Sequence, residues 1–221
     1  QRHAANCVTC GLGWGRARIF REMLLAAKDD EPDTSVVQRA CAGLDRVEVE
    51  HEAIRFGRFK TPIGVVFVGV TDKGVCDVTF GQPSERLYRA GLLRRSSKVW
   101  RDDAGLTNVG EELKAYFSGE LVRFSLSVDL SQVKPFTVRV LKETCRIQFG
   151  DVKSYGEIAT RVGLPNGGRA VGGALGRNPV PIIIPCHRVI EKGGRLGGFT
   201  GGLSTKRILL TLEGHCFTEP S

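Results

Sequence analysis

The chain has 221 residues, 41% of them apolar and 25% charged, which is enough for one large or two ordinary domains with a buried core. No stretch approaches the roughly 18 apolar residues of a membrane span and no signal peptide is visible, so we expect no membrane partner. The 7 scattered cysteines do not look like a disulfide framework, and we expect a reducing compartment: the cytoplasm, or the nucleus in a eukaryote.

The net charge of +8 is unevenly distributed along the chain. Residues 131–221 carry 13 Lys and Arg against 6 Asp and Glu, whereas residues 1–130 carry 19 against 18. A basic half attracts a polyanion such as DNA through its phosphates. A merely soluble basic surface has the same composition, so charge alone leaves both interpretations open.

Residues 1–50 form the first of three predicted segments. His3, Cys7 and Cys10 have the spacing H-x3-C-x2-C, and a helical stretch and the acidic run 29–33, which indicates a linker, follow them. Three such ligands can hold Zn²⁺ with a fourth from elsewhere. The spacing is similar to the second half of the zinc motif of anti-sigma factors, which implies a sigma-factor-like partner for this segment. Two incidental cysteines in a lead-in are the alternative.

Residues 51–130 are predicted to form a small α/β domain. Stretches that are β-branched or alternating, broken by turn residues, indicate an antiparallel meander over residues 54–61, 63–70 and 75–80. Helical patterns follow near 84–95 and 108–117, and the alternation over 122–128 predicts a further strand.

Residues 131–217 are predicted to be mainly helical up to a cysteine motif. Apolar spacing indicates a helix over 136–147, and a capping box, Ser154 to Glu157, starts another at 155 that runs to about 162. After a Gly/Pro turn, a helix over 168–177 completes a pattern compatible with a helix-turn-helix. The small residues of this last helix allow a close approach, either to a DNA groove or to a neighbouring helix.

The apolar run 180–184 indicates a short buried strand that ends at Pro185-Cys186-His187-Arg188-Val189. Such a strand would hold the Cys186 thiol on rigid backbone, as a nucleophile requires. The adjacent His187 is either a base that helps to form the thiolate or a structural histidine with satisfied hydrogen bonds.

Three motifs of this half closely resemble the O6-alkylguanine-DNA alkyltransferase family. They are Ser154-Tyr155, then Gly168 to Gly172 with Arg177 to Ile190, and finally Gly197 to Leu203 with Lys206 and Leu212-Glu213-Gly214. The match is dense over 135–214, looser over 53–130 and does not extend to 1–50. It implies a small ribonuclease-H-like α/β domain followed by a helical domain with a winged helix-turn-helix-like DNA-binding motif.

The resemblance implies a suicide methyltransferase that repairs double-stranded DNA containing O6-alkylguanine. The alkyl group would move irreversibly to Cys186 in a single turnover, no cofactor would be required, and we expect a monomer. An ordinary cysteine, with a pKa of about 8.5, is only about 3% thiolate at pH 7. The resemblance supplies a relay from Cys186 through water to His187, which Glu213 orients.

The same resemblance assigns the remaining site residues. Tyr155 would donate to the departing guanine, and Asn178 would hydrogen-bond near the thiol. Arg169 would fill the gap left by a flipped nucleotide, the alternatives being a phosphate contact or a surface ion pair. Further contacts are expected from Leu175 and Pro181 as walls of the base pocket, from Thr200 in the loop 193–202 that closes over the base, and from Thr137, Gly156 and Lys192 along the DNA strand.

A second function is compatible with the sequence: a non-enzymatic regulator that senses lesions or binds DNA, with residues 1–50 contacting a sigma factor. The retained Cys186 argues against a purely binding role, because relatives that only bind lesions lack that thiol. A hybrid, in which methylation of Cys186 alters regulation, combines the two.

Overall fold

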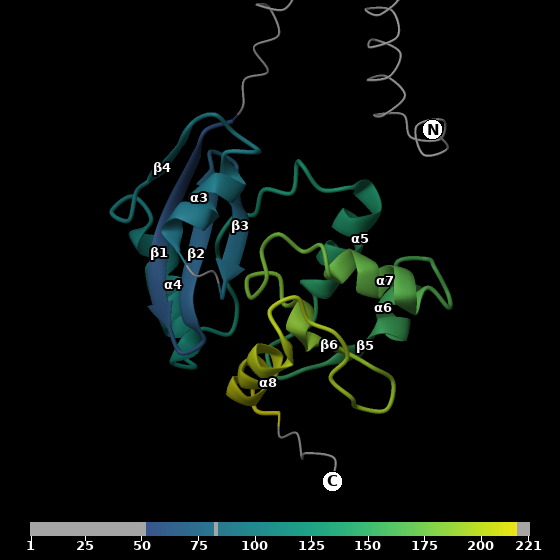
Figure 1. Ribbon diagram of the computed structural model, residues 1–221. Coiled ribbons are helices and arrows are strands. Elements are labelled where there is room, and N and C mark those ends of the chain that lie inside the picture. Colours follow the sequence, from purple (N-terminus) through teal and green to yellow (C-terminus); the bar gives the residue numbers. More distant parts are fainter. Residues whose placement is uncertain (1–51, 82–83, 216–221) are drawn as a thin grey trace, which may run out of the picture. The chain divides into compact units, whose positions relative to one another are not determined.

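The computed structural model describes residues 52–81 and 84–215 (Figure 1). Up to residue 130 it contains a four-stranded sheet in the order β3-β2-β1-β4. The three-stranded meander is antiparallel, as predicted, and β4 pairs with β1 in parallel at the edge. The elements are β1 (Ile54–Thr61), β2 (Gly64–Thr71), β3 (Gly74–Phe80), α3 (Glu85–Leu92), β4 (Val99–Arg101) and α4 (Thr107–Phe117).

Both faces of the sheet are covered, because successive side chains of a strand point to opposite sides. Val66 and Val68 of β2 enter a core that α4 covers, whereas Phe67 enters a second core with Tyr88 and Leu92 of α3. The two helices therefore cover opposite faces of the sheet.

Residues 135–215 are mainly helical and contain the predicted helix-turn-helix, formed by α6 and α7. Ser154 caps α6 with the predicted box: its hydroxyl accepts from the Glu157 N–H, and the Glu157 carboxylate accepts from the Ser154 N–H. The elements are α5 (Pro135–Thr144), β5 (Lys153–Ser154), α6 (Tyr155–Arg161), α7 (Gly168–Leu175), the 3₁₀ turn η1 (Cys186–Arg188), β6 (Val189–Ile190) and α8 (Leu203–Leu212).

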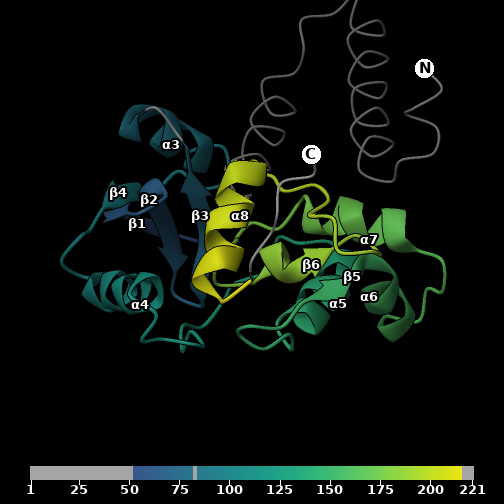
Figure 2. The same cartoon turned by 90° about the horizontal axis from the view of Figure 1, so that it is seen from below.

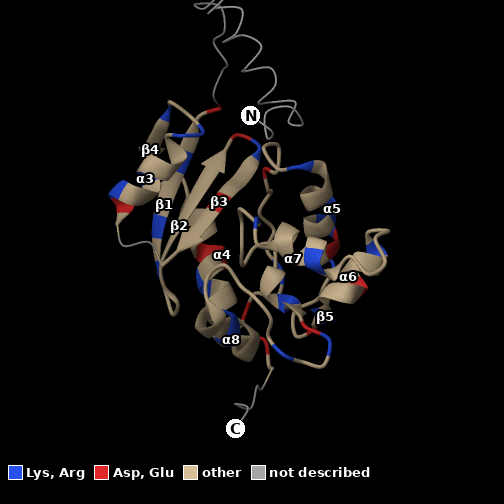
Figure 3. Cartoon of the chain, turned by 45° about the vertical axis from the view of Figure 1, so that its right-hand side comes forward, with Lys and Arg blue, Asp and Glu red and all other residues tan. Residues whose placement is uncertain are grey.

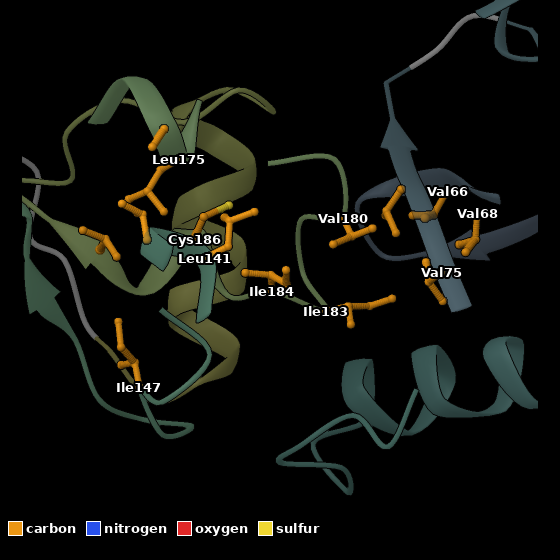
Figure 4. Close-up of a cluster of buried hydrophobic side chains, with 14 of the residues drawn as sticks. Val66, Val68, Val75, Leu141, Ile147, Leu175, Val180, Ile183, Ile184 and Cys186 are labelled. Atoms are coloured by element: carbon orange, nitrogen blue, oxygen red, sulfur yellow. The ribbon is translucent and has the colours of Figure 1, made fainter. Parts of the chain in front are cut away.

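The sheet part and the helical part share one core. The Val78 N–H of β3 donates to the Pro179 carbonyl at 2.7 Å, so the segment that leads to Cys186 lies along the edge of the sheet. Val180 and Ile183 of this segment lie next to Val66 and Val75 (Figure 4). In Figures 1 and 2, α8 lies between the sheet and the helices α5 to α7.

The predicted strand over residues 122–128 is wrong. This segment makes a single bridge, between Val75 and Val128, although the alternation correctly places Phe124 and Leu126 against the core. The edge of β3 is divided: residues 127–129 bond at Val75, and Pro179 takes the hydrogen bond at Val78. No continuous edge is left for a fifth strand.

The predicted strand over residues 180–184 is also wrong, because the segment forms a turn closed by a bridge from Pro181 to Ile184. Pro179, Pro181 and Pro185 lack the N–H that a strand ladder needs. Ile182 takes a left-handed conformation with φ 77, which costs about 1–3 kcal/mol and which its complete burial helps to offset. Cys186 therefore begins a 3₁₀ turn rather than ending a strand.

Candidate active site

Cys186 lies at the start of η1 and is 7% exposed. The Asn178 amide donates from Nδ2 to the Cys186 sulfur and to the Ile184 carbonyl, both at 3.1 Å. Its Oδ1 accepts from the Val180 N–H at 3.0 Å. Asn178 therefore ties the turn to the thiol, close to the sulfur as the sequence predicts.

His187 is completely buried beside the thiol residue, and its Nε2 lies 2.8 Å from Oε1 of Glu213, the residue that caps α8. An ionised carboxylate only accepts hydrogen bonds, so Nε2 carries the proton and Nδ1 keeps its lone pair. Nδ1 is buried and has no hydrogen-bond partner among the described residues. The histidine is thus oriented as a base, and its free lone pair fits the predicted relay through water.

Two residues for which the sequence predicted no role complete the surroundings of Glu213. Arg188 donates to both carboxylate oxygens, from Nε at 2.8 Å and from Nη2 at 3.0 Å, and to the Ile147 carbonyl from Nη1 at 2.7 Å. The Tyr116 hydroxyl of α4 donates to Oε1 at 2.7 Å. Arg188 follows directly from the cysteine motif, but no sequence signal places Tyr116 beside a residue 97 positions later.

The environment of each group sets its protonation. Burial raises the pKa of the Cys186 thiol to about 11, although the Asn178 hydrogen bond and the Lys206 ammonium act the other way. Burial also lowers the pKa of His187 in spite of its bond to Glu213. Burial would raise the pKa of Glu213, but hydrogen bonds from His187 and Arg188 bring it down to about 2. At neutral pH the site therefore holds a thiol, a neutral imidazole and a carboxylate.

A pocket of about 550 Å³ opens at the Cys186 thiol. Its size falls within the roughly 300–1,000 Å³ of small-molecule sites. Gly168 and Gly172 of α7 face Tyr155 of α6, and a Cβ atom at either position would lie at an ordinary contact distance from the tyrosine. The other lining residues come from the two helices and the following loop: Arg169, Leu175, Gly176, Glu191, Gly198, Phe199 and Thr200.

Lys206 of α8 is a buried cation behind this pocket. Its Nζ donates to the carbonyls of Val189 at 2.6 Å, Leu196 at 2.5 Å and Gly198 at 3.4 Å. The Tyr155 hydroxyl donates to the same Gly198 carbonyl at 3.1 Å. Lys206 therefore anchors the loop that forms part of the pocket wall. The shared Gly198 carbonyl links Tyr155 to the same loop.

A second pocket, of about 180 Å³, also borders Cys186. Pro181 lines this smaller pocket and not the larger one, while Leu175 and Thr200 line both. Phe80 of β3 contributes to it as well, so the sheet part reaches the surroundings of the thiol.

The residues expected to meet DNA divide into accessible and buried ones. Arg169, Gly156 and Lys192 are exposed, and Thr200, also exposed, donates to the Gly176 carbonyl at 3.2 Å. Figure 3 shows Lys and Arg on α5, on α7 and in the loop that precedes α8.

Thr137, also expected along the DNA strand, is only 2% exposed, so its side chain contributes little to the surface of α5. It lies three and four positions before Val140 and Leu141, which are also buried, so all three share the inward face of α5. The helical period placed this residue in the core.

No group of three or more His, Cys, Asp or Glu side chains is arranged to hold a metal ion within residues 52–81 and 84–215. The predicted zinc ligands His3, Cys7 and Cys10 lie outside the described residues. In the same described ranges, no helix has the length and apolar character needed to cross a membrane.

A thiol that lines a pocket, followed in the chain by a buried histidine paired with a glutamate, is the arrangement expected of a protein that uses cysteine as a nucleophile, and it lies next to a helix-turn-helix. Comparison with known proteins gives the particular family. The 6-O-methylguanine DNA methyltransferase ribonuclease-like domain matches residues 54–130, and the DNA binding domain of the same family matches 135–215. The chain therefore belongs to the 6-O-methylguanine DNA methyltransferase family, which confirms the resemblance.

Individual relatives agree with this assignment. The methylated-DNA–protein-cysteine methyltransferase of Methanosarcina acetivorans is 36% identical over 160 residues, covering 72% of this chain and 97% of that protein. The Mycobacterium bovis protein of the same name is 47% identical over 115 residues, covering 52% and 69%. The crystal structure of Mycobacterium tuberculosis OGT in complex with DNA has a TM-score of 0.63 and 35% identity, and the match covers 72% of this chain and 92% of that one.

Proposed function

We propose that this chain repairs O6-alkylguanine in double-stranded DNA by transferring the alkyl group irreversibly to Cys186. The observation that carries the assignment is the position of this thiol at a pocket of about 550 Å³, with Asn178 bonded to the sulfur. The other two described cysteines, Cys76 and Cys145, line neither of the pockets that border Cys186.

The transfer forms a carbon–sulfur bond as the carbon–oxygen bond to guanine breaks. The thiol proton passes through a water molecule to Nδ1 of His187, and Glu213 stabilises the imidazolium. Tyr155 donates from the pocket wall to the departing guanine, because expelling an unprotonated anion is costly. The thioether product has no easy leaving path, so one chain repairs one lesion and needs no cofactor.

In this proposal, the pocket at Cys186 binds the flipped base and α7 contacts the DNA. The target atom lies within the base stack, so the nucleotide must flip out at a cost of a few kcal/mol. Arg169 is exposed at the second position of α7 and lines the pocket, which suits a side chain that fills the gap. Gly156 and Lys192 are exposed for contacts with the strand. The structure of the M. tuberculosis relative in complex with DNA supports DNA as the partner.

The assignment is tested by counting alkyl groups transferred per chain from an oligonucleotide duplex that contains O6-methylguanine. The wild-type chain should remove one methyl group and then stop, and Cys186→Ala should remove none. Cys145→Ala is the matched control and should behave as the wild type, because that exposed thiol lies outside both pockets. Continued turnover, or repair by Cys186→Ala, would contradict the proposal.

The remaining proposals concern properties outside the site. We infer a reducing cytoplasm, or the nucleus of a eukaryote, from the scattered cysteines, and a monomer from the resemblance to the family. For residues 1–50 we propose a zinc site at His3, Cys7 and Cys10 and a sigma-factor-like partner. Metal analysis of the intact chain, with Cys7→Ser as the comparison, tests the zinc site.

A further inference from the structure

The Tyr116 hydroxyl comes from the sheet part of the molecule, yet it meets the catalytic pair. It donates to Oε1 of Glu213 at 2.7 Å and lies 3.4 Å from Nε2 of His187. None of the reacting groups of the proposed transfer comes from residues 52–130. Tyr116 is therefore a direct polar link from the sheet part to the relay.

The aromatic ring of Tyr116 is held on several sides. The side chain is 1% exposed. Its ring meets Phe117 edge to face at a centroid distance of 5.3 Å, Phe124 at 5.2 Å and Phe149 edge to face at 6.3 Å. Such pairs add to the apolar burial of a ring and restrict its orientation. These contacts restrict the orientation of the ring and therefore fix the position of the Tyr116 hydroxyl.

The hydroxyl can act only as a donor to the carboxylate. Burial raises the pKa of Tyr116, and the negative Glu213 raises it further, so the phenol keeps its proton at every pH at which the protein works. Oε1 of Glu213 accepts from Tyr116, from His187 and from Nη2 of Arg188. Tyr116 therefore helps to hold Oε1 where it must meet Nε2 of His187.

We propose that Tyr116 is a positioning residue for the alkyl transfer. Its hydroxyl fixes Oε1 of Glu213 against Nε2–H of His187, which keeps the Nδ1 lone pair available for the proton of Cys186. The sheet part is then a component of the active site and not only its support. This inference rests on the proposed role of Cys186.

The test is Tyr116→Phe, assayed by alkylation of Cys186 with free O6-benzylguanine, which needs no DNA. Loss of a hydrogen bond to a charged group should slow the reaction by about tenfold. The acid limb of the pH–rate profile should move to higher pH, because a carboxylate with one donor fewer holds a proton on His187 more strongly. The charged groups that shift the pKa of His187 are Glu213, Arg188 and Lys206, and the variant leaves all three in place.

Two comparisons separate positioning from general stability. Tyr88→Phe removes the hydroxyl of another buried tyrosine of the sheet part, whose ring stacks on Phe67, and should leave rate and profile unchanged. In a Glu213→Gln background, most of the effect of Tyr116→Phe should disappear, because the tyrosine acts through that carboxylate. Equal losses in both backgrounds, or an unshifted profile, would overturn the inference.

The wild-type chain in the same assay separates this inference from the proposed function: no alkylation of Cys186 by the wild type would sink the function itself. If Tyr116→Phe does not fold, nitrogen NMR of His187 in the wild type still tests the geometry on which the proposal rests. The proposal requires the tautomer with the proton on Nε2 at neutral pH, and a proton on Nδ1 would contradict it.

Discussion

The buried environment of the Cys186 thiol favours its protonated form. Its pKa of about 11 keeps it protonated at neutral pH, and protonated thiols are poor nucleophiles and resist oxidation. In the proposed transfer, the neutral His187 accepts the proton as the sulfur attacks.

The buried Glu213 carboxylate gives a pH dependence of stability that belongs to this site. Its pKa of about 2 lies below the ordinary 4.5, so its hydrogen bonds stabilise the fold fully above pH 4.5 and are lost as the pH falls towards 2. The shift corresponds to about 3 kcal/mol. Unfolding by denaturant, measured across this pH range, should show the loss in the wild type.

Glu213→Gln should be less stable at neutral pH and should lack most of this slope, since an amide does not titrate. Glu120→Gln, a change at an exposed glutamate just after α4, should keep the wild-type slope. A Glu213→Gln variant that loses stability with acid as steeply as the wild type would show that other groups dominate.

The motif predicted the residues of the relay, because its members lie close together in a recognisable pattern or end the last helix. It did not predict Tyr116 or the anchoring role of Lys206. Tyr116 has the apolar spacing of an ordinary core residue of α4, and only the docking of α4 near α8 brings it to Glu213. The resemblance likewise does not indicate that Thr137 lies on the buried face of α5.

At the scale of elements, α7 shows how one short helix serves two contacts. Gly168 and Gly172 face Tyr155 of α6, while Arg169 and Ala170 are exposed. Both alternatives left open by the small residues of this helix are therefore compatible with the structure: close packing on a neighbouring helix, and a small outer face suited to a DNA groove.

We expect Arg169→Ala to slow repair of O6-methylguanine in duplex DNA far more than attack on free benzylguanine, because only the duplex requires a flipped base. Arg177→Ala is the matched control, since it removes the same charge from an exposed position just beyond α7. Arg177→Ala should weaken DNA binding only through lost phosphate contacts. It should not produce the large gap between the rate on duplex DNA and the rate on free benzylguanine that is expected for Arg169→Ala. Equal losses on duplex and free base for Arg169→Ala would rule out its role in filling the gap.

The helices and the meander were predictable from period and capping, whereas the segments beside the site were not. The apolar run 180–184 satisfies the rule for a buried strand, but three prolines around it remove donors and turn the chain. The resulting turn places Asn178 and Cys186 within a hydrogen bond of each other, which a strand of that length would not do.

At the scale of the whole described molecule, the site lies where the sheet part and the helical part meet. Pro179 bonds the edge of β3, and Tyr116 of α4 reaches Glu213 of the last helix. Local sequence patterns define each part, but they contain no information on how the two dock. The contact between the two parts places Tyr116 beside Glu213, and for that reason only the structure reveals this part of the site.

The claim that Cys186 keeps the alkyl carbon is tested most directly by peptide mass spectrometry after reaction with a duplex that carries a deuterium-labelled O6-methylguanine. The peptide with Cys186 should gain one labelled methyl group in place of one hydrogen, while the peptides with Cys76 and Cys145 stay unchanged. Repaired DNA beside an unmodified Cys186 peptide, or label on another residue, would contradict the account.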